Sequence, residues 1–141
     1  MRYRVVAVGR IRQAALRAAC DDYLDRLRRY ARVDEREVKD DGRVLGAVPE
    51  DSHFVALSRR GEASTSIELA DQVGRWELEG RDVTFAIGGA VALPEPVLRR
   101  ADKIWSLSRL TFPHELARLV LYEQLYRAHT IRRGEPYHRG G

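Results

Sequence analysis

The residues best suited to chemistry gather at the C-terminal end of this 141-residue sequence. Tyr137, His138 and Arg139 place a phenol, an imidazole and a guanidinium next to one another. An imidazole can accept or relay a proton, and a guanidinium can offset developing negative charge. A chain end ordinarily frays into solvent. The composition of this tail favours a site over a solvated terminus.

Two further segments have the composition of ligand-binding loops. Gly88-Gly89 follows the apolar run Val83 to Ile87, and glycine allows a backbone to approach a ligand closely. An ordinary turn accounts for the same pair. The second segment runs from Leu107 to Phe112, between an apolar run and Pro113, which suits the start of a helix.

The elements that must position these residues alternate between strands and helices. Apolar or alternating runs predict strands over residues 4–8, 33–38, 54–57, 83–87 and 104–107. Helical spacing predicts helices over residues 15–30, from the capping box at 65–68 to Glu79, from Pro94 or Glu95, and from Pro113 to about Thr130. This order predicts one α/β domain, residues 1–141, with a mostly parallel sheet and helices on both faces.

An open parallel sheet binds ligands beyond the carboxyl ends of its strands. Three predicted strand ends carry suitable residues, namely Leu57-Ser58, Ile87 to Gly89, and Leu107 to Phe112. We expect these ends to converge on one binding site.

The net charge of +4 suits a polyanionic partner, because arginine and lysine release counterions from phosphate. No apolar run reaches the length of a membrane helix and no signal-peptide core follows Met1, which predicts a cytoplasmic protein. The one cysteine, Cys20, lies on the apolar side of a predicted helix and suits the core. The four histidines and Cys20 lack metal-ligand spacing, so we expect no metal.

The C-terminal pattern resembles the RlmH family of SPOUT methyltransferases. The matching positions are Ser106, Ser108, Thr111, Pro113, His114, Arg118, Glu123, Tyr126, Arg127, Ala128, Tyr137, His138 and Arg139. The likeness continues upstream through Val6 to Gly9, Leu78 to Val83, and Ile87 to Gly89. It implies a trefoil knot near the C-terminus, which the rarity of knots would not have predicted.

The resemblance also implies a reaction, a cofactor and partners. The family methylates N3 of a pseudouridine in large-subunit (23S) ribosomal RNA, which suggests the assembled ribosome as substrate, and it works as a homodimer whose neighbouring subunit completes each pocket. The implied S-adenosylmethionine contacts are Leu57, Gly88, Leu107, Ser108, Arg109, Leu110, Thr111 and Phe112. The implied catalytic residues are Tyr137, His138 and Arg139, with Tyr137 able to stack on the exposed base.

One departure from the family pattern bears on activity. The family usually has a third glycine after the glycine pair, where this chain has Ala90-Val91-Ala92. If that glycine requires positive φ, alanine there would cost about 1–2 kcal/mol. An alternative function is therefore an RNA-binding or ribosome-assembly protein with weakened or lost methyl transfer. The strand ends by themselves also allow an unrelated, flavodoxin-like nucleotide binder.

Overall fold

The sheet is built around β4 (Val83–Ile87), whose five residues are all buried. The structure, a computed structural model, describes residues 1–140. β4 lies between β1 (Arg2–Val8) and β3 (His53–Ala63), with β2 (Arg32–Val38) and β5 (Lys103–Ser106) at the two edges. All four neighbouring pairs are parallel, so the predicted α/β class with a parallel sheet is confirmed.

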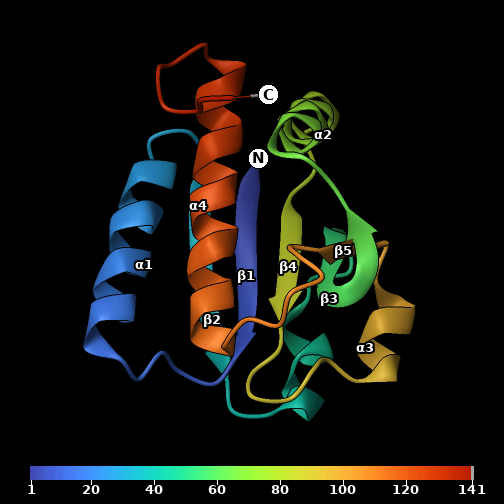
Figure 1. Ribbon diagram of the computed structural model, residues 1–141. Helices are drawn as coiled ribbons and strands as arrows, with labels where there is room; N and C mark the ends of the chain where they lie inside the picture. Colours follow the sequence, from blue (N-terminus) through green and yellow to red (C-terminus); the bar gives the residue numbers. More distant parts are fainter. Residues whose placement is uncertain (141) are drawn as a thin grey trace.

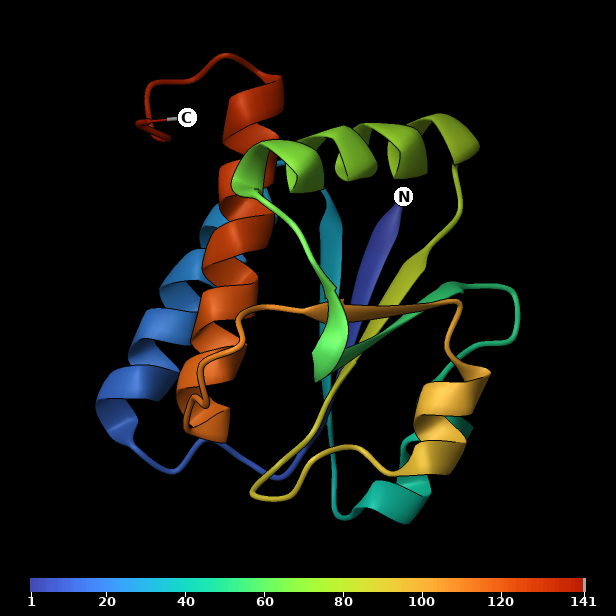
Figure 2. The same cartoon turned by 45° about the vertical axis from the view of Figure 1, so that its right-hand side comes forward.

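Helices cover both faces of this sheet, as Figures 1 and 2 show. α1 (Ala14–Leu27), α2 (Ser66–Glu79) and α4 (His114–Arg132) pack on one face, over a core that includes Tyr3 and Phe85. The other face is covered by α3 (Glu95–Arg100) and the 3-10 turns η1 (Asp41–Arg43) and η2 (Leu45–Ala47). The chain therefore forms three layers, with helices on both sides of the sheet.

Local signals set the helix ends close to the predicted positions. Thr65 accepts a hydrogen bond from the Glu68 amide while the Glu68 carboxylate accepts one from Thr65, which confirms the capping box before α2. Gly80 ends α2 in the left-handed conformation. Pro113 is the residue before α4 rather than its first helical residue.

β3 is longer than the four-residue strand predicted over 54–57. It continues through polar residues to Ala63, and its pairing with β5 shifts register between Leu57 and Glu62. Gly61 makes this continuation possible, because a Cβ there would lie 2.5 Å from the carbonyl oxygen of Ile104. Apolar patterning missed this part of the strand because its residues after Leu57 are partly or fully exposed.

α4 lies against both α1 and α2. Its inner residues Leu121 and Leu125 are fully buried in the core of this same chain. Apolar residues on several sides of this helix suggest a dimer, but these two leucines are explained without a second subunit. The predicted homodimer therefore needs other support, and the predicted knot stays a prediction.

Candidate active site

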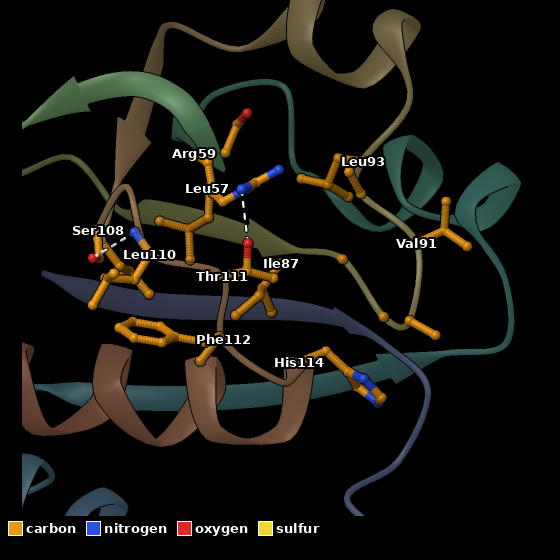
Figure 3. Close-up of a pocket in the computed structure, with 17 residues that line it drawn as sticks. Leu57, Arg59, Ile87, Val91, Leu93, Ser108, Leu110, Thr111, Phe112 and His114 are labelled. Atoms are coloured by element: carbon orange, nitrogen blue, oxygen red, sulfur yellow. Dashed lines mark hydrogen bonds between the residues drawn. The ribbon is translucent and has the colours of Figure 1, made fainter.

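A pocket of about 310 Å³ opens beyond the carboxyl ends of β4 and β5, next to Leu57, Ser58 and Arg59 of β3. The three segments converge as predicted, although β3 continues past the pocket to Ala63. Figure 3 shows side chains from the end of β3, the loop after β4, and the loop between β5 and α4 lying around it. Seven of the eight predicted cofactor residues line this pocket. These are Leu57, Gly88, Leu107, Ser108, Leu110, Thr111 and Phe112. Arg109 is exposed and is not among the lining residues.

The glycine pair after β4 is required by close backbone packing. A Cβ on Gly88 would lie 2.7 Å from the carbonyl oxygen of Val91, and one on Gly89 would lie 2.9 Å from the carbonyl oxygen of Val8. Neither glycine has positive φ. The pair therefore lets the loop fold back on itself and against β1, which shapes one wall of the pocket.

The alanine-containing loop is not strained. No non-glycine residue among residues 1–140 has positive φ, so Ala90 and Ala92 adopt conformations that alanine tolerates. The conditional cost of 1–2 kcal/mol for a missing third glycine does not apply here. The loop has a conformation that needs no glycine at these positions, and the structural argument for lost cofactor binding falls away.

The loop from β5 to α4 is held by three hydrogen bonds. Ser106 donates to the Ser108 carbonyl (3.0 Å), the Leu110 amide donates to the Ser108 hydroxyl (3.0 Å), and Arg59 donates to the Thr111 hydroxyl (2.7 Å). Two of these bonds are drawn in Figure 3. The loop is thus fixed both internally and to the end of β3.

The same loop leaves backbone donors available. Within residues 1–140, the backbone amides of Arg109, Thr111 and Phe112 make no hydrogen bond to another protein group. Val91 and Leu110, at the pocket, expose 71% and 70% of their surface. A pocket with free amides and apolar walls suits a flat, uncharged ring system with hydrogen-bonding edges.

Sequence patterns missed several lining residues. Arg59, Leu93, His114 and Ala117 also line the pocket. Arg59 follows a predicted strand end by two residues, and this position could have identified it as a pocket residue. His114 and Ala117 line the pocket because the first turn of α4 closes it. Only the three-dimensional fold brings this turn to the pocket.

At the other end of α4, the C-terminal tail is anchored on its own chain. The Tyr137 hydroxyl donates to Glu123 (2.8 Å) and lies 3.0 Å from the Tyr23 hydroxyl. Its ring meets Tyr126 edge-on at 4.7 Å, and the Arg127 guanidinium lies 4.8 Å from the ring centroid. Burial and these hydrogen bonds raise the pKa of Tyr137, so the hydroxyl stays protonated. In this arrangement Tyr137 fixes the tail and its ring is already engaged.

His138 is oriented by Arg127. Its Nδ1 lies 3.0 Å from Arg127 Nη1, and because a guanidinium only donates hydrogen bonds, Nδ1 is the acceptor. A neutral ring then carries its hydrogen on Nε2, which is buried without a partner among the described residues. Arg127 is held in turn by the Glu123 carboxylate at 2.6 and 3.1 Å, and this contact raises the pKa of Arg127. Arg139 is exposed.

The pocket and the tail are far apart within one chain. His114 at the pocket and Arg127 at the tail are both on α4, and thirteen residues of helix span about 20 Å. Figure 1 shows the segment that follows α4 at the opposite end of this helix from the loop that precedes it. The structure therefore assembles the predicted cofactor residues and the predicted tail residues as two separate groups.

A buried arginine stabilises the pocket end of the molecule through hydrogen bonds and ion pairs. No sequence pattern had assigned it a role. Arg118 on α4 is 2% exposed and bonds to Glu35, Glu37 and the Gly9 carbonyl. Burial favours the neutral form of Glu35, but hydrogen bonds from Tyr122 and from arginine lower its pKa overall. Because Gly9 directly follows the strand end on which Gly89 packs, this network supports the glycine loop.

Within residues 1–140, no three His, Cys, Asp or Glu side chains come together in a way that could hold a metal ion. None of the helices in this part of the chain is long and apolar enough to cross a membrane.

The parallel sheet and the glycine-lined pocket at its strand ends agree with the comparison to known families. Residues 1–138 match the family described as "Predicted SPOUT methyltransferase". The chain belongs to this family and is a methyltransferase.

The chain is also similar to individual methyltransferases that are named for their RNA substrate. The chain is 50% identical over 143 residues to the ribosomal RNA large subunit methyltransferase H of Sorangium cellulosum, covering 97% of this chain and 99% of the relative. It is 44% identical over 153 residues to the enzyme of the same name from Anaeromyxobacter dehalogenans, covering 99% and 100%. A solved probable methylase family protein from Haemophilus influenzae shares the fold, with a TM-score of 0.62, 10% identity, and coverage of 98% of this chain and 70% of that one.

Proposed function

We propose that this protein transfers the methyl group of S-adenosylmethionine to N3 of a pseudouridine in large-subunit ribosomal RNA, within the assembled ribosome. The substrate follows from relatives named for large-subunit ribosomal RNA at 44–50% identity over nearly the whole chain. The observation in the structure that carries the proposal is the pocket beyond the carboxyl ends of β4 and β5 and beside the middle of β3.

The pocket fits the proposed cofactor. Its volume of about 310 Å³ lies at the lower end of the range for small-molecule sites. The free amides of Arg109, Thr111 and Phe112 can meet the edges of an adenine ring, and Leu57 and Ile87 can pack against its faces. When bound, S-adenosylmethionine supplies an electrophilic methyl group on a sulfonium. The chain therefore has to position this group and manage the proton of the acceptor nitrogen.

We propose a homodimer in which the tail of one subunit completes the pocket of the other. A single chain holds the pocket residues and the tail residues about 20 Å apart, so it cannot bring them together without unfolding the tail from α4. Leu116, Val120, Glu123 and Arg127 recur at spacings of four, three and four, which places them on one side of α4. All four are half-buried, so this stripe joins the pocket end to the tail end and is available to a second copy.

The tail residues then have distinct roles. N3 of pseudouridine carries a proton at neutral pH. Loss of this proton to solvent places negative charge on the flanking carbonyl oxygens, and this charge must be stabilised until the methyl group bonds to N3. Arg139 is exposed and can reach these oxygens. His138, with Nδ1 held by Arg127, can donate from Nε2 once that atom is uncovered. Tyr137 holds the segment in place through Glu123.

The alternatives are less well supported. The family match and the methyltransferase relatives argue against an unrelated flavodoxin-like protein. A protein that binds RNA but has lost methyl transfer was suggested by the Ala90-Val91-Ala92 loop, and that loop is unstrained.

The test is methyl transfer to ribosomes from a strain that lacks this enzyme, read by mass spectrometry of the ribosomal RNA. We expect one added methyl group on a pseudouridine. Calorimetry with S-adenosylmethionine separates the failures. Cofactor binding without transfer would favour the RNA-binding alternative, and no cofactor binding would overturn the assignment of the pocket.

A further inference from the structure

A second depression lies directly beside the cofactor pocket. It has a volume of about 210 Å³ and lies between the end of β3 and α3. Its lining residues are Ser58, Arg60, Glu95, Leu98, Arg99 and Ile104. Ser58 also lines the cofactor pocket, so the two depressions adjoin at this residue. We call the second depression the arginine groove.

The arginines of this groove are free. Arg60 and Arg99 are exposed, and neither forms an ion pair with a carboxylate among residues 1–140. Glu95 is placed one helical turn before Arg99, the spacing at which a salt bridge commonly forms, and no such pair is present. Elsewhere in the chain such pairs do form at the same spacing, for example Arg17 with Asp21 and Arg26 with Asp22.

The floor of the arginine groove is apolar. Leu98 and Ile104 are half-buried and lie among the same lining residues as the two guanidinium groups. Single-stranded nucleic acid presents this combination of chemistry, because charged phosphates alternate with sugars and with bases that have apolar faces. Guanidinium groups also bind phosphate oxygens in a bidentate manner.

We propose that the arginine groove binds the single-stranded RNA next to the methylated nucleotide, with Arg60 and Arg99 on its phosphates. This inference rests on the proposed function and extends it. Ser58 joins the groove to the cofactor pocket, so a strand held there leads its next nucleotide to the methyl donor. Phosphate contacts fix the register of a bound strand without reading its sequence. The groove thus positions the substrate, while the tail acts on the base.

The experiment compares two double variants of the full-length protein. Arg60→Gln with Arg99→Gln removes the groove charges. Arg75→Gln with Arg81→Gln is the matched control, because it removes two exposed arginines that also lack carboxylate partners and lie on α2 and before β4. Binding to a fluorescein-labelled single-stranded RNA of mixed sequence is measured over a range of salt concentrations.

We expect the groove variant to bind this RNA at least about tenfold more weakly, with a slope of log affinity against log salt reduced by about 1.4, since each phosphate contact on a single strand contributes about 0.7. The control keeps the wild-type slope. In ribosome methylation the groove variant raises KM with little change in kcat, as expected for a contact made equally in the ground and transition states. Its affinity for S-adenosylmethionine, measured by calorimetry, is unchanged.

Equal RNA affinity and salt slope in the groove and control variants would overturn the inference. So would saturable binding of inorganic phosphate that is lost in the groove variant while RNA binding is kept, because the groove would then be a small-anion site. Failure of the proposed function is distinguishable. In that case wild-type protein binds RNA through the groove but transfers no methyl group.

Discussion

The two ends of α4 differ in chemistry and in what holds them together. At its start, Gly88 and the loop before the helix form a pocket of apolar side chains and free backbone amides. Around its second half, Glu123, Arg127 and Tyr137 form a network of charged and hydroxyl groups. The first end is suited to holding a neutral ring and the second to managing charge and protons. The proposed methyl transfer uses both ends, and one chain keeps them about 20 Å apart.

This difference is the basis of the proposed site shared between two subunits, because one chain completes the fold but does not bring the two groups together. The core includes Leu121 and Leu125 and is closed without a partner. The buried Nε2 of His138 remains without a hydrogen-bond partner among the described residues. Such a group is costly to leave unpaired, and in the proposed dimer the RNA base or the partner subunit would supply its acceptor.

The largest effect is expected at the tail. Deletion of residues 137–141 should lower methyl transfer by about a thousandfold or more, because both proton handling and charge stabilisation are lost. Cofactor affinity and the dimer should persist, since the pocket lies at the other end of α4. Substitution of His138 alone should cost less, because residues that act as a unit are not additive. A truncated protein that methylates ribosomes at the full-length rate would show that the tail has no catalytic role.

A smaller effect is expected at the pocket. Gly88→Ala should weaken S-adenosylmethionine binding by about tenfold or more, since its Cβ would lie 2.7 Å from the Val91 carbonyl oxygen and the loop must shift. Ala92→Gly is the matched control and should bind no more tightly than wild type, because Ala92 is unstrained. Calorimetry measures both variants. Tighter binding by Ala92→Gly would mean that the loop prefers a glycine conformation after all.

The two ends of α4 also differ in how much of each could be predicted from the sequence. The place of the pocket follows from strand periodicity, because parallel strands bring their carboxyl ends to one edge of the sheet. The eight cofactor contacts were implied by the family resemblance, and seven of them line the pocket. The eighth residue, Arg109, lies in a turn. Neither helical nor strand periodicity determines the direction in which a side chain in a turn points. At the tail, the sequence located Tyr137 and His138 but not their anchoring, because contacts with Tyr23 and Glu123 span 114 and 14 residues.

Another expected effect concerns stability rather than activity, at the tail end of α4. His129 is buried against Tyr3, and this burial lowers the pKa of His129 from 6.5 to about 4. Between these values the unfolded chain binds a proton that the folded chain does not. The free energy of unfolding should therefore fall by about 3 kcal/mol as the pH decreases through this window. Urea unfolding at several pH values measures the slope.

Two variants sharpen this pH test. His129→Gln should flatten the dependence of unfolding free energy on pH, because the titrating group is gone. Tyr3→Phe keeps the histidine buried and should keep the slope, while losing about 1 kcal/mol of stability with the hydrogen bond. An unchanged slope in His129→Gln would place the titrating group elsewhere in the chain.

The most direct test of a site shared between subunits is a mixture of two inactive variants. Gly88→Val disables the pocket and leaves the tail, and deletion of residues 137–141 disables the tail and leaves the pocket. Co-expressed in equal amounts, they should recover about a quarter of wild-type methyl transfer, because half of the randomly formed dimers hold one intact site of two. If each chain uses its own tail, every site in the mixture is defective, and a mixture as inactive as its parents would contradict the account.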